Sequence, residues 1–245
     1  MSLSFRTSNC VYSIRLPYQR PQAFLLSVFN FMKNIVVLIS GRGSNFKAVY
    51  ETSAKEKWAE IWGIRIVGVI SNRPDAAGLE FAQSVGIPTA VVDHKKYEDR
   101  ESFERDLVKQ IEAFRGDLVV LAGFMRVLTP YFVRQYPGRI LNIHPALLPS
   151  FPGLHTHERA LEAGVRIHGV TVHFVSDVLD GGEIIGQAAV PVLAGDTPDK
   201  LAERVLKKEH ILYPRAIRLV ACQKVRLEEG TVKMDLESSE QLAIF

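Results

Sequence analysis

Two polar residues, Asn142 and His144, stand two positions apart where a mostly apolar run, residues 139–143, comes to an end. If this run forms a strand, both side chains point to the same face of the sheet. Polar side chains at such a place are costly unless they are used or hydrogen bonded. An amide beside an imidazolium can bind a carbonyl oxygen on which negative charge develops. A turn cap by the asparagine and a purely structural histidine would explain the pair equally well.

A carboxylate favours the first of these interpretations. Asp180 lies in the turn-rich segment 176–183, which we expect on the same side of the sheet as His144. A carboxylate close to an imidazole favours its protonated form, which is an electrophile and a proton donor. No serine or cysteine is placed to join His144 as a nucleophile, so we do not expect a covalent acyl-enzyme. Asn142, His144 and Asp180 therefore predict the polar centre of an active site in which an external amine attacks a bound acyl group directly.

A second candidate site is the glycine loop at residues 41–45, between a buried run and a helical stretch. Glycines at such a place let backbone N–H groups approach a phosphate, which the helix dipole favours. A dinucleotide fingerprint would need a glycine at Phe46 and an acid near Asn72, and a Walker loop would need Gly-Lys-Ser/Thr. A phosphomonoester cradle and a plain tight turn remain. Ser44 and Asn45 favour the cradle, because both can donate to phosphate, and we expect Asn45 to cap the helix as well.

The elements that must position these residues follow from the apolar pattern. Runs at 34–40, 64–70, 117–122 and 139–143 are typical of parallel strands buried on both faces, and a shorter strand is expected at 88–92. Helical spacing separates them at 45–56, 76–85, 99–114 and 129–136. This alternation predicts an α/β fold with a doubly wound, mostly parallel sheet. Ligands of such sheets bind beyond the carboxyl ends of the strands.

The second half of the chain changes character. Residues 169–175 alternate as a strand, and 183–190 predict one antiparallel return strand. A long helix is expected at 197–220, kinked or divided by Pro214, followed by a small hairpin at 224–234. We find no linker or repeat, so residues 33–235 predict a single domain and 236–245 a frayed tail.

Composition sets broad limits on the function. Of 245 residues 47% are hydrophobic, which suits one continuous core. The net charge of +3 equals the contribution of Arg6, Arg15 and Arg20, and the remaining chain has as many acidic as basic residues, so we expect no nucleic-acid binding. Two cysteines form no Cys-x-x-Cys pair, and no apolar run is long enough to span a membrane. A cytoplasmic location is the default expectation.

Residues 1–32 differ in composition from the rest of the chain. They are basic, contain serines and lack acids, which are traits of a transit peptide. An apolar patch at 24–29 could serve a signal peptide, but no convincing small-residue cleavage site stands after it. We interpret the segment as a disordered extension or a start codon assigned too early, with Met32 as the functional start.

Together these motifs resemble the phosphoribosylglycinamide formyltransferase family, over roughly residues 33–235. The segments that carry the resemblance are 41–45, 122–126, 142–149, 152–157 and 179–182. The Asn-x-His-Pro and Leu-Asp-Gly-Gly segments are shared by several folate-dependent formyl enzymes. The Gly-x-Gly-Ser-Asn loop is what points to a ribosyl phosphate substrate.

The resemblance implies transfer of formyl from 10-formyltetrahydrofolate to the primary amine of glycinamide ribonucleotide, in purine synthesis, by a monomer or homodimer. It implies that Asn142 and His144 hold the formyl oxygen, while Asp180 keeps His144 charged and relays protons. Gly43, Ser44, Asn45 and Glu209 match the ribonucleotide site. The folate side matches Arg100, Met125, Arg126, Val127 and Leu128, with Asn142, Ser176, Asp177, Val178, Leu179 and Asp180.

Other interpretations stay open at this point. A folate-dependent hydrolase would share the Asn–His–Asp centre but need no phosphate loop. A transferase for charged tRNA should carry a further C-terminal domain, and a non-catalytic nucleotide-binding module would not explain the Asn–His–Asp centre. His155 and His157, with His144 and His173, could suggest a metal cluster. The pattern lacks a third well-spaced ligand, so we expect no metal.

Overall fold

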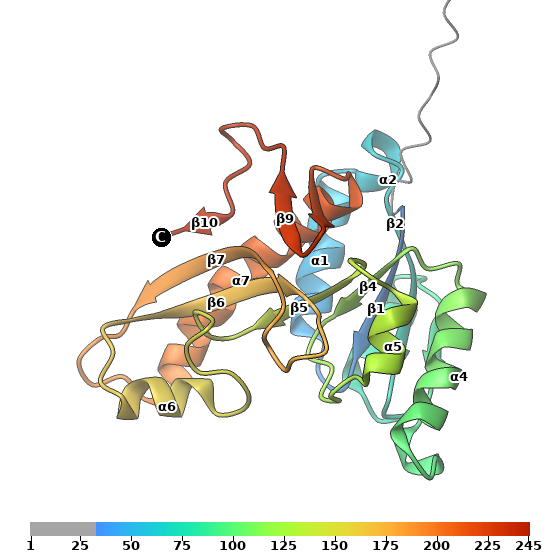
Figure 1. Ribbon diagram of the computed structural model, residues 1–245, viewed down its shortest axis with the longest axis horizontal. Helices are drawn as coiled ribbons and strands as arrows, with labels where there is room; N and C mark the ends of the chain where they lie inside the picture. The colour runs from blue at the N-terminus through green and yellow to red at the C-terminus, as the bar shows by residue number, and fades with distance from the viewer. Residues whose placement is uncertain (1–32) are drawn as a thin grey trace, which may run out of the picture. The chain divides into compact units, whose positions relative to one another are not determined.

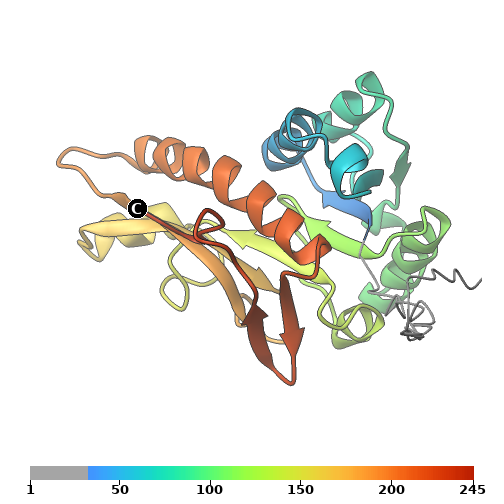
Figure 2. The same ribbon diagram turned by 90° about the horizontal axis from the view of Figure 1, so that it is seen from above.

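The computed structural model describes residues 33–245, which fold around an eight-stranded sheet (Figures 1 and 2). The strand order is β10-β7-β6-β5-β4-β1-β2-β3. Its strands are β1 Asn34–Ile39, β2 Arg65–Ser71, β3 Thr89–Val91, β4 Leu118–Leu121, β5 Ile140–His144, β6 Ile167–Phe174, β7 Ile184–Pro191 and β10 Ala243–Ile244. A separate hairpin joins β8 Val225–Glu228 to β9 Thr231–Met234. The expectations for residues 1–32 lie outside the described residues.

Five of the seven α-helices in residues 33–245 lie close to the ranges expected from the sequence, and those at 58–61 and 156–162 were not predicted. The helices are α1 Ser44–Lys55, α2 Trp58–Ile61, α3 Ala77–Ser84, α4 Arg100–Ala113, α5 Pro130–Gln135, α6 Thr156–Glu162 and α7 Pro198–Ala221, with a short 3₁₀ helix at His94–Lys96. Strands β1 to β5 are all parallel. The chain builds outward from β1 to β3 and then returns to β4 on the other side of β1. This reversal is the topological switch point at which ligands of doubly wound sheets bind.

Helices cover the two faces of the sheet unequally. Alternate residues of β1 enter two cores: Ile35, Val37 and Ile39 pack with α1, α3 and α7, and Val36 and Leu38 pack with α4 and α5. Figure 1 shows α7 extending behind β5, β6 and β7, while α4 and α5 lie over the other half of the sheet. The second face of β5 and β6 is therefore left to loops.

One strand runs against all others, as predicted, but it is β6. It pairs antiparallel with both β5 and β7, so β7 itself points the same way as β5. The return strand that we expected at 183–190 is thus antiparallel only to its hairpin partner. Phe174, the last residue of β6, pairs with Leu141 near the start of β5. The loop after β6 therefore leaves from the opposite edge to the one we expected.

Two expectations about the C-terminal part are wrong. Pro214 does not divide α7, which is one helix of 24 residues whose Pro214 is buried with the face that packs on the sheet. Residues 236–245 are not a frayed tail, because β10 pairs with β7 and the N–H of Gln187 donates to the carbonyl of Leu242 over 2.8 Å. Leu242 is buried, and Glu240 accepts from Lys224 Nζ at 2.8 Å. Within residues 33–245, none of the helices is sufficiently long and apolar to cross a membrane.

Candidate active site

Asn142 and His144 project from β5 toward the face that α4 and α5 leave uncovered. Their neighbours Leu141 and Ile143 belong to the core under α7, so the alternation of the strand sends the two polar residues the other way. His144 is buried and Asn142 is half-buried. The predicted pair is therefore placed together, inside the sheet rather than at a helix cap.

His144 has a hydrogen-bond acceptor at each ring nitrogen. Its Nδ1 lies 3.4 Å from Asp180 Oδ2, and both side chains are almost completely buried. Its Nε2 lies 2.9 Å from the carbonyl oxygen of Phe151, which can only accept. A doubly protonated ring satisfies both contacts, whereas a neutral ring would turn a lone pair toward one acceptor. Asp180 approaches the imidazole directly.

Asp180 reaches this place because its loop folds back over the sheet. Although the loop leaves β6 beside the start of β5, Asp180 Oδ2 accepts from the N–H of Gly153 at 2.8 Å, which joins it to the turn after β5. Asp180 has a φ of 49°. Gly182 lies so close to the strand end that a Cβ there would stand 1.9 Å from the carbonyl oxygen of Phe174. The Leu-Asp-Gly-Gly segment therefore combines a positive φ at Asp180 with a glycine where the backbone passes too close to Phe174 for a side chain.

The role of His173 was not predicted from the sequence, where this residue was considered only as a metal ligand. His173 pairs with Asn142 across the β5–β6 ladder. Its Nδ1 lies 2.8 Å from the carbonyl oxygen of Phe174 and must donate there, so Nε2 accepts from Asn142 Nδ2 at 3.2 Å. Burial lowers the pKa of His173, which keeps the ring neutral in this arrangement. The amide orientation of Asn142 is thereby fixed, and the antiparallel register was the signal that could have found it.

The turn after β5 is held by a threonine on β6. Thr171 Oγ1 donates to the carbonyl of Ala146 at 2.7 Å and accepts from the N–H of Leu148 at 3.0 Å. Gln187 donates to both Thr171 Oγ1 and the carbonyl of Leu148. The Leu148–Pro149 peptide bond is cis. These contacts fix residues 146–148, the first part of the turn that leads from His144 to Phe151.

The glycine loop leads into α1, but its asparagine does not cap that helix. Gly43, with a φ of 70°, is the residue that precedes the first turn, and no side chain caps it. Asn45 Nδ2 instead donates to Glu209 Oε2 on α7 at 2.6 Å, and both side chains are buried. Asn45 Oδ1 has no partner among the described residues, and burial raises the pKa of Glu209. Ser44 is exposed at the helix start.

A second glycine, which was not singled out from the sequence, shapes this loop. Gly78, at the start of α3, donates its N–H to the carbonyl of Gly41 at 3.0 Å. A Cβ on Gly43 would lie 3.1 Å from the Cα of Gly78, so the two backbones meet without side chains. Tyr213 lies one helical turn after Glu209 in α7. Its hydroxyl donates to the carbonyls of Leu121 and Leu141, which fixes this part of α7 against β4 and β5.

Comparison with known proteins decides the family. Residues 33–217 match the formyl transferase family. The chain belongs to that family.

Relatives within the formyl transferase family include the phosphoribosylglycinamide formyltransferase of Escherichia coli K12, which is 48% identical over 82% of this chain and 93% of that protein. A trifunctional purine biosynthetic protein adenosine-3 of Bos taurus is 48% identical over 80% of this chain and 19% of that longer protein. The solved phosphoribosylglycinamide formyltransferase of Coxiella burnetii covers 86% of this chain and 99% of its own, with 43% identity and a TM-score of 0.79.

The predicted folate-side residues of this formyl transferase lie around the same uncovered face. Met125, Arg126, Val127 and Leu128 form the irregular segment between β4 and α5. Ser176, Asp177, Val178 and Leu179 form the turn before Asp180, in which Ser176 Oγ and the backbone of Val178 approach each other at 3.3–3.4 Å. Met125, Val127, Val178 and Leu179 are large apolar side chains left exposed.

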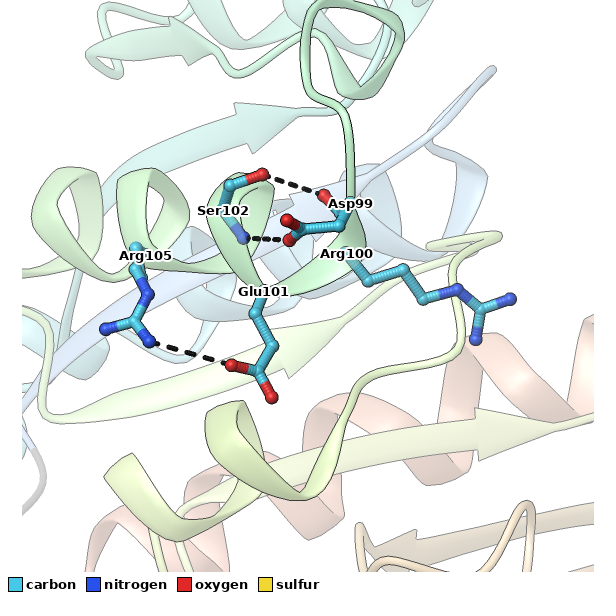
Figure 3. A pocket seen from close by; sticks show the side chains of 5 residues that line it. All are labelled: Asp99, Arg100, Glu101, Ser102 and Arg105. Carbon is cyan, nitrogen blue, oxygen red and sulfur yellow. Dashed lines mark hydrogen bonds and ion pairs between the residues drawn. The ribbon is translucent and has the colours of Figure 1, made fainter.

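Arg100 stands apart from this set at the start of α4. It lines a shallow depression with Asp99, Glu101, Ser102 and Arg105 (Figure 3). Asp99 caps the helix through the N–H of Ser102 at 2.7 Å. Figure 3 shows the guanidinium of Arg100 pointing away from the Glu101–Arg105 ion pair. No contact joins Arg100 to the Asn142–His144–Asp180 centre in the part of the chain that the structure describes.

The histidine pattern does not assemble a metal centre in residues 33–245. No group of three or more His, Cys, Asp or Glu side chains there is placed to hold an ion. His155 is exposed, whereas His157 packs against His168 with ring centroids 5.3 Å apart. His168 was not singled out from the sequence.

Proposed function

We propose that this protein transfers the formyl group of 10-formyltetrahydrofolate to the primary amine of glycinamide ribonucleotide, in cytoplasmic purine synthesis, without a metal ion. The observation that carries the proposal is the placement of His144 between Asp180 and the Phe151 carbonyl, beside an Asn142 amide whose orientation is fixed. Membership of the formyl transferase family and the identity to phosphoribosylglycinamide formyltransferases support the substrates.

In the proposed reaction the amine attacks the formyl carbon and forms the new carbon–nitrogen bond. The electron pair of the carbonyl moves to the formyl oxygen, where donors from Asn142 and His144 stabilise it. The bond from the carbon to the folate nitrogen then breaks. That nitrogen gains a proton and the attacking amine loses one, so tetrahydrofolate leaves. Asp180 stabilises the charged His144 throughout and accepts or relays the proton of the amine.

One hydrogen bond must be exchanged for this step. In the structure both ring nitrogens of His144 are occupied, by Asp180 and by the Phe151 carbonyl. The formyl oxygen replaces the Phe151 carbonyl, because that carbonyl belongs to a turn whose residues 150–154 lie at or near the surface. The donor on Nε2 then exchanges one acceptor for another and is never left unpaired.

The ribonucleotide phosphate is proposed to bind at Gly43, Ser44 and Asn45, where the start of the 12-residue helix α1 favours an anion. Glu209 and the unpartnered Asn45 Oδ1 are acceptors for hydroxyl groups of the sugar. The formyl donor is proposed to lie against residues 125–128 and 176–180, with Arg100 toward its far end.

The decisive experiment measures tetrahydrofolate release with and without glycinamide ribonucleotide. Turnover should require the amine, and turnover that is indifferent to it would identify a hydrolase instead. His144→Ala should lower kcat by at least about 100-fold, since it removes a donor to the oxyanion. Ser44→Ala should mainly raise the ribonucleotide KM. His155→Asn serves as the control, because His155 is exposed just before α6. It should leave kcat and the ribonucleotide KM unchanged.

A further inference from the structure

The segment at residues 125–128 has little structure of its own. It is irregular, and the side chains of Met125 and Val127 are 71% and 51% exposed. The backbone N–H groups of Arg126, Val127 and Leu128 donate no hydrogen bond within residues 33–245. Fixed ends favour binding of a ligand to the backbone of such a segment, because ordering freely rotating residues on binding costs conformational entropy.

A serine holds the first end. Ser40, the residue after β1, accepts from the N–H of Met125 at 2.8 Å. Its hydroxyl donates in turn to Asn72 Oδ1 at 2.6 Å, and both Ser40 and Asn72 are buried. The carboxyl ends of β1 and β2 are thus connected through Ser40 to the start of the segment.

A carboxylate holds the second end. Glu104 on α4 is 1% exposed and accepts from the N–H of Thr129 at 2.8 Å and from the Thr129 hydroxyl. Burial raises the pKa of Glu104, so this carboxyl group occupies a costly position. An apolar residue would fill the place without that cost, yet it could not bind the N–H and hydroxyl of Thr129.

We propose that Ser40 and Glu104 are positioning residues that fix the two ends of segment 125–128 for binding of the formyl-folate. Neither residue touches a substrate in this proposal, which rests on the proposed function. Two buried polar side chains from different parts of the fold thus hold the same short segment in place. This arrangement also explains why an irregular, exposed segment can present unpaired backbone groups in a defined geometry.

Steady-state kinetics with each substrate varied in turn test the proposal. Glu104→Ala should raise the formyl-folate KM about tenfold, since it removes both hydrogen bonds to Thr129, the residue that ends the segment. The ribonucleotide KM should change less than about twofold, because the Asn45–Glu209 contact is separate. Thr129→Val, which replaces the hydroxyl with a methyl group and keeps the N–H, should give a smaller effect in the same direction. Thr129→Ser should match the native protein.

The matched control is Glu112→Gln, at an exposed position of the same helix. Thermal unfolding of every variant separates loss of fold from loss of positioning. If Glu104→Ala lowers the melting temperature while the formyl-folate KM stays unchanged, Glu104 is only structural and the proposal is wrong. If Glu104→Ala does not fold, Thr129→Val replaces it in the test. A raised formyl-folate KM with an unchanged ribonucleotide KM supports the proposal, and two unchanged KM values contradict it.

Coupling between the two ends gives a further test. Because Ser40 and Glu104 hold the same short segment, releasing one end removes part of what the other contributes. Ser40→Ala combined with Glu104→Ala should therefore raise the formyl-folate KM by less than the product of the single effects. Effects that multiply would contradict the shared role. The native protein is measured in the same assay: if it shows no amine-dependent turnover, the proposed function fails, whereas native turnover with an unshifted KM in the variants refutes the positioning alone.

Discussion

Acid should destabilise this fold through one buried histidine on β6. His168 is 1% exposed, packs edge-on against Phe151 with ring centroids 5.9 Å apart, and has no hydrogen-bond partner at either ring nitrogen among the described residues. Burial, and then the nearby His157, lower the pKa of His168 from its ordinary value of 6.5 to about 4. The nearby carbonyl of Pro145 offsets only part of this shift.

The sign and size of the effect follow from these two values. The unfolded chain binds a proton below about pH 6.5, whereas the folded chain binds it only near pH 4. This contribution to stability is therefore present above the unfolded pKa and is lost as the pH falls through the window between the two values. Between about pH 7 and about pH 5 the loss amounts to about 2 kcal/mol for His168 alone. His157, whose pKa burial also lowers, adds to the same slope.

The assay is urea unfolding at about pH 7 and about pH 5, with native protein and His168→Phe. Phenylalanine keeps a ring against Phe151 but cannot take up a proton. We expect the variant to lose about 2 kcal/mol less than the native protein between the two pH values. His155→Asn is the control, because His155 is exposed and its positive φ of 57° suits asparagine. An equal pH dependence in native protein and His168→Phe would show that protonation of His168 does not cause the loss of stability.

Three further changes have defined outcomes. Gly78→Ala places a Cβ 2.6 Å from Ile39 Cδ1 and should raise the ribonucleotide KM about tenfold without changing the formyl-folate KM in steady-state assays. His173→Ala frees the Asn142 amide and should lower kcat about tenfold at saturating substrates, with KM values unchanged. Leu242→Ala removes a buried side chain of the C-terminal segment and should cost about 2–3 kcal/mol in urea unfolding, with kcat retained.

The parallel half of the fold could be predicted because its signals are local. Buried parallel strands need apolar runs, and the runs at 34–40, 117–122 and 139–143 became β1, β4 and β5. The helix expected at 99–114 became α4 because its apolar spacing reflects one buried face. The single α/β domain and the formyl transferase family follow from the same segments.

The features that we predicted wrongly depend on contacts between residues that are far apart in the sequence. Asn45 at a helix start is a good cap by local rules, yet its amide binds Glu209, 164 positions away. The tail at 236–245 has no long apolar run, and it is ordered by pairing with β7 and by the contact of Glu240 with Lys224. Ser40 and Glu104 were missed for the same reason, since a single buried serine or glutamate has no local pattern.

The direction of β6 explains why the site lies on a sheet face rather than beyond the strand ends alone. Because β6 is antiparallel to β5, His173 stands opposite Asn142, and the β6–β7 loop begins beside the start of β5. Although β7 begins beside the end of β6, the loop between them folds back over this face, which brings Asp180 to His144. A further parallel strand would have required a crossover, whose helix would cover one face of the sheet.

The same geometry separates the roles of the histidines that share this region. Burial lowers the pKa values of His157, His168 and His173, so each of these rings is held neutral. His173 also lies 3.9 Å from Asp180, but its Nε2 already accepts from Asn142, which a protonated Nε2 could not do. His144 is the ring that has an acceptor facing each nitrogen. Asp180 therefore pairs with His144 and not with His173, because the Nε2 of His173 is already hydrogen bonded to Asn142.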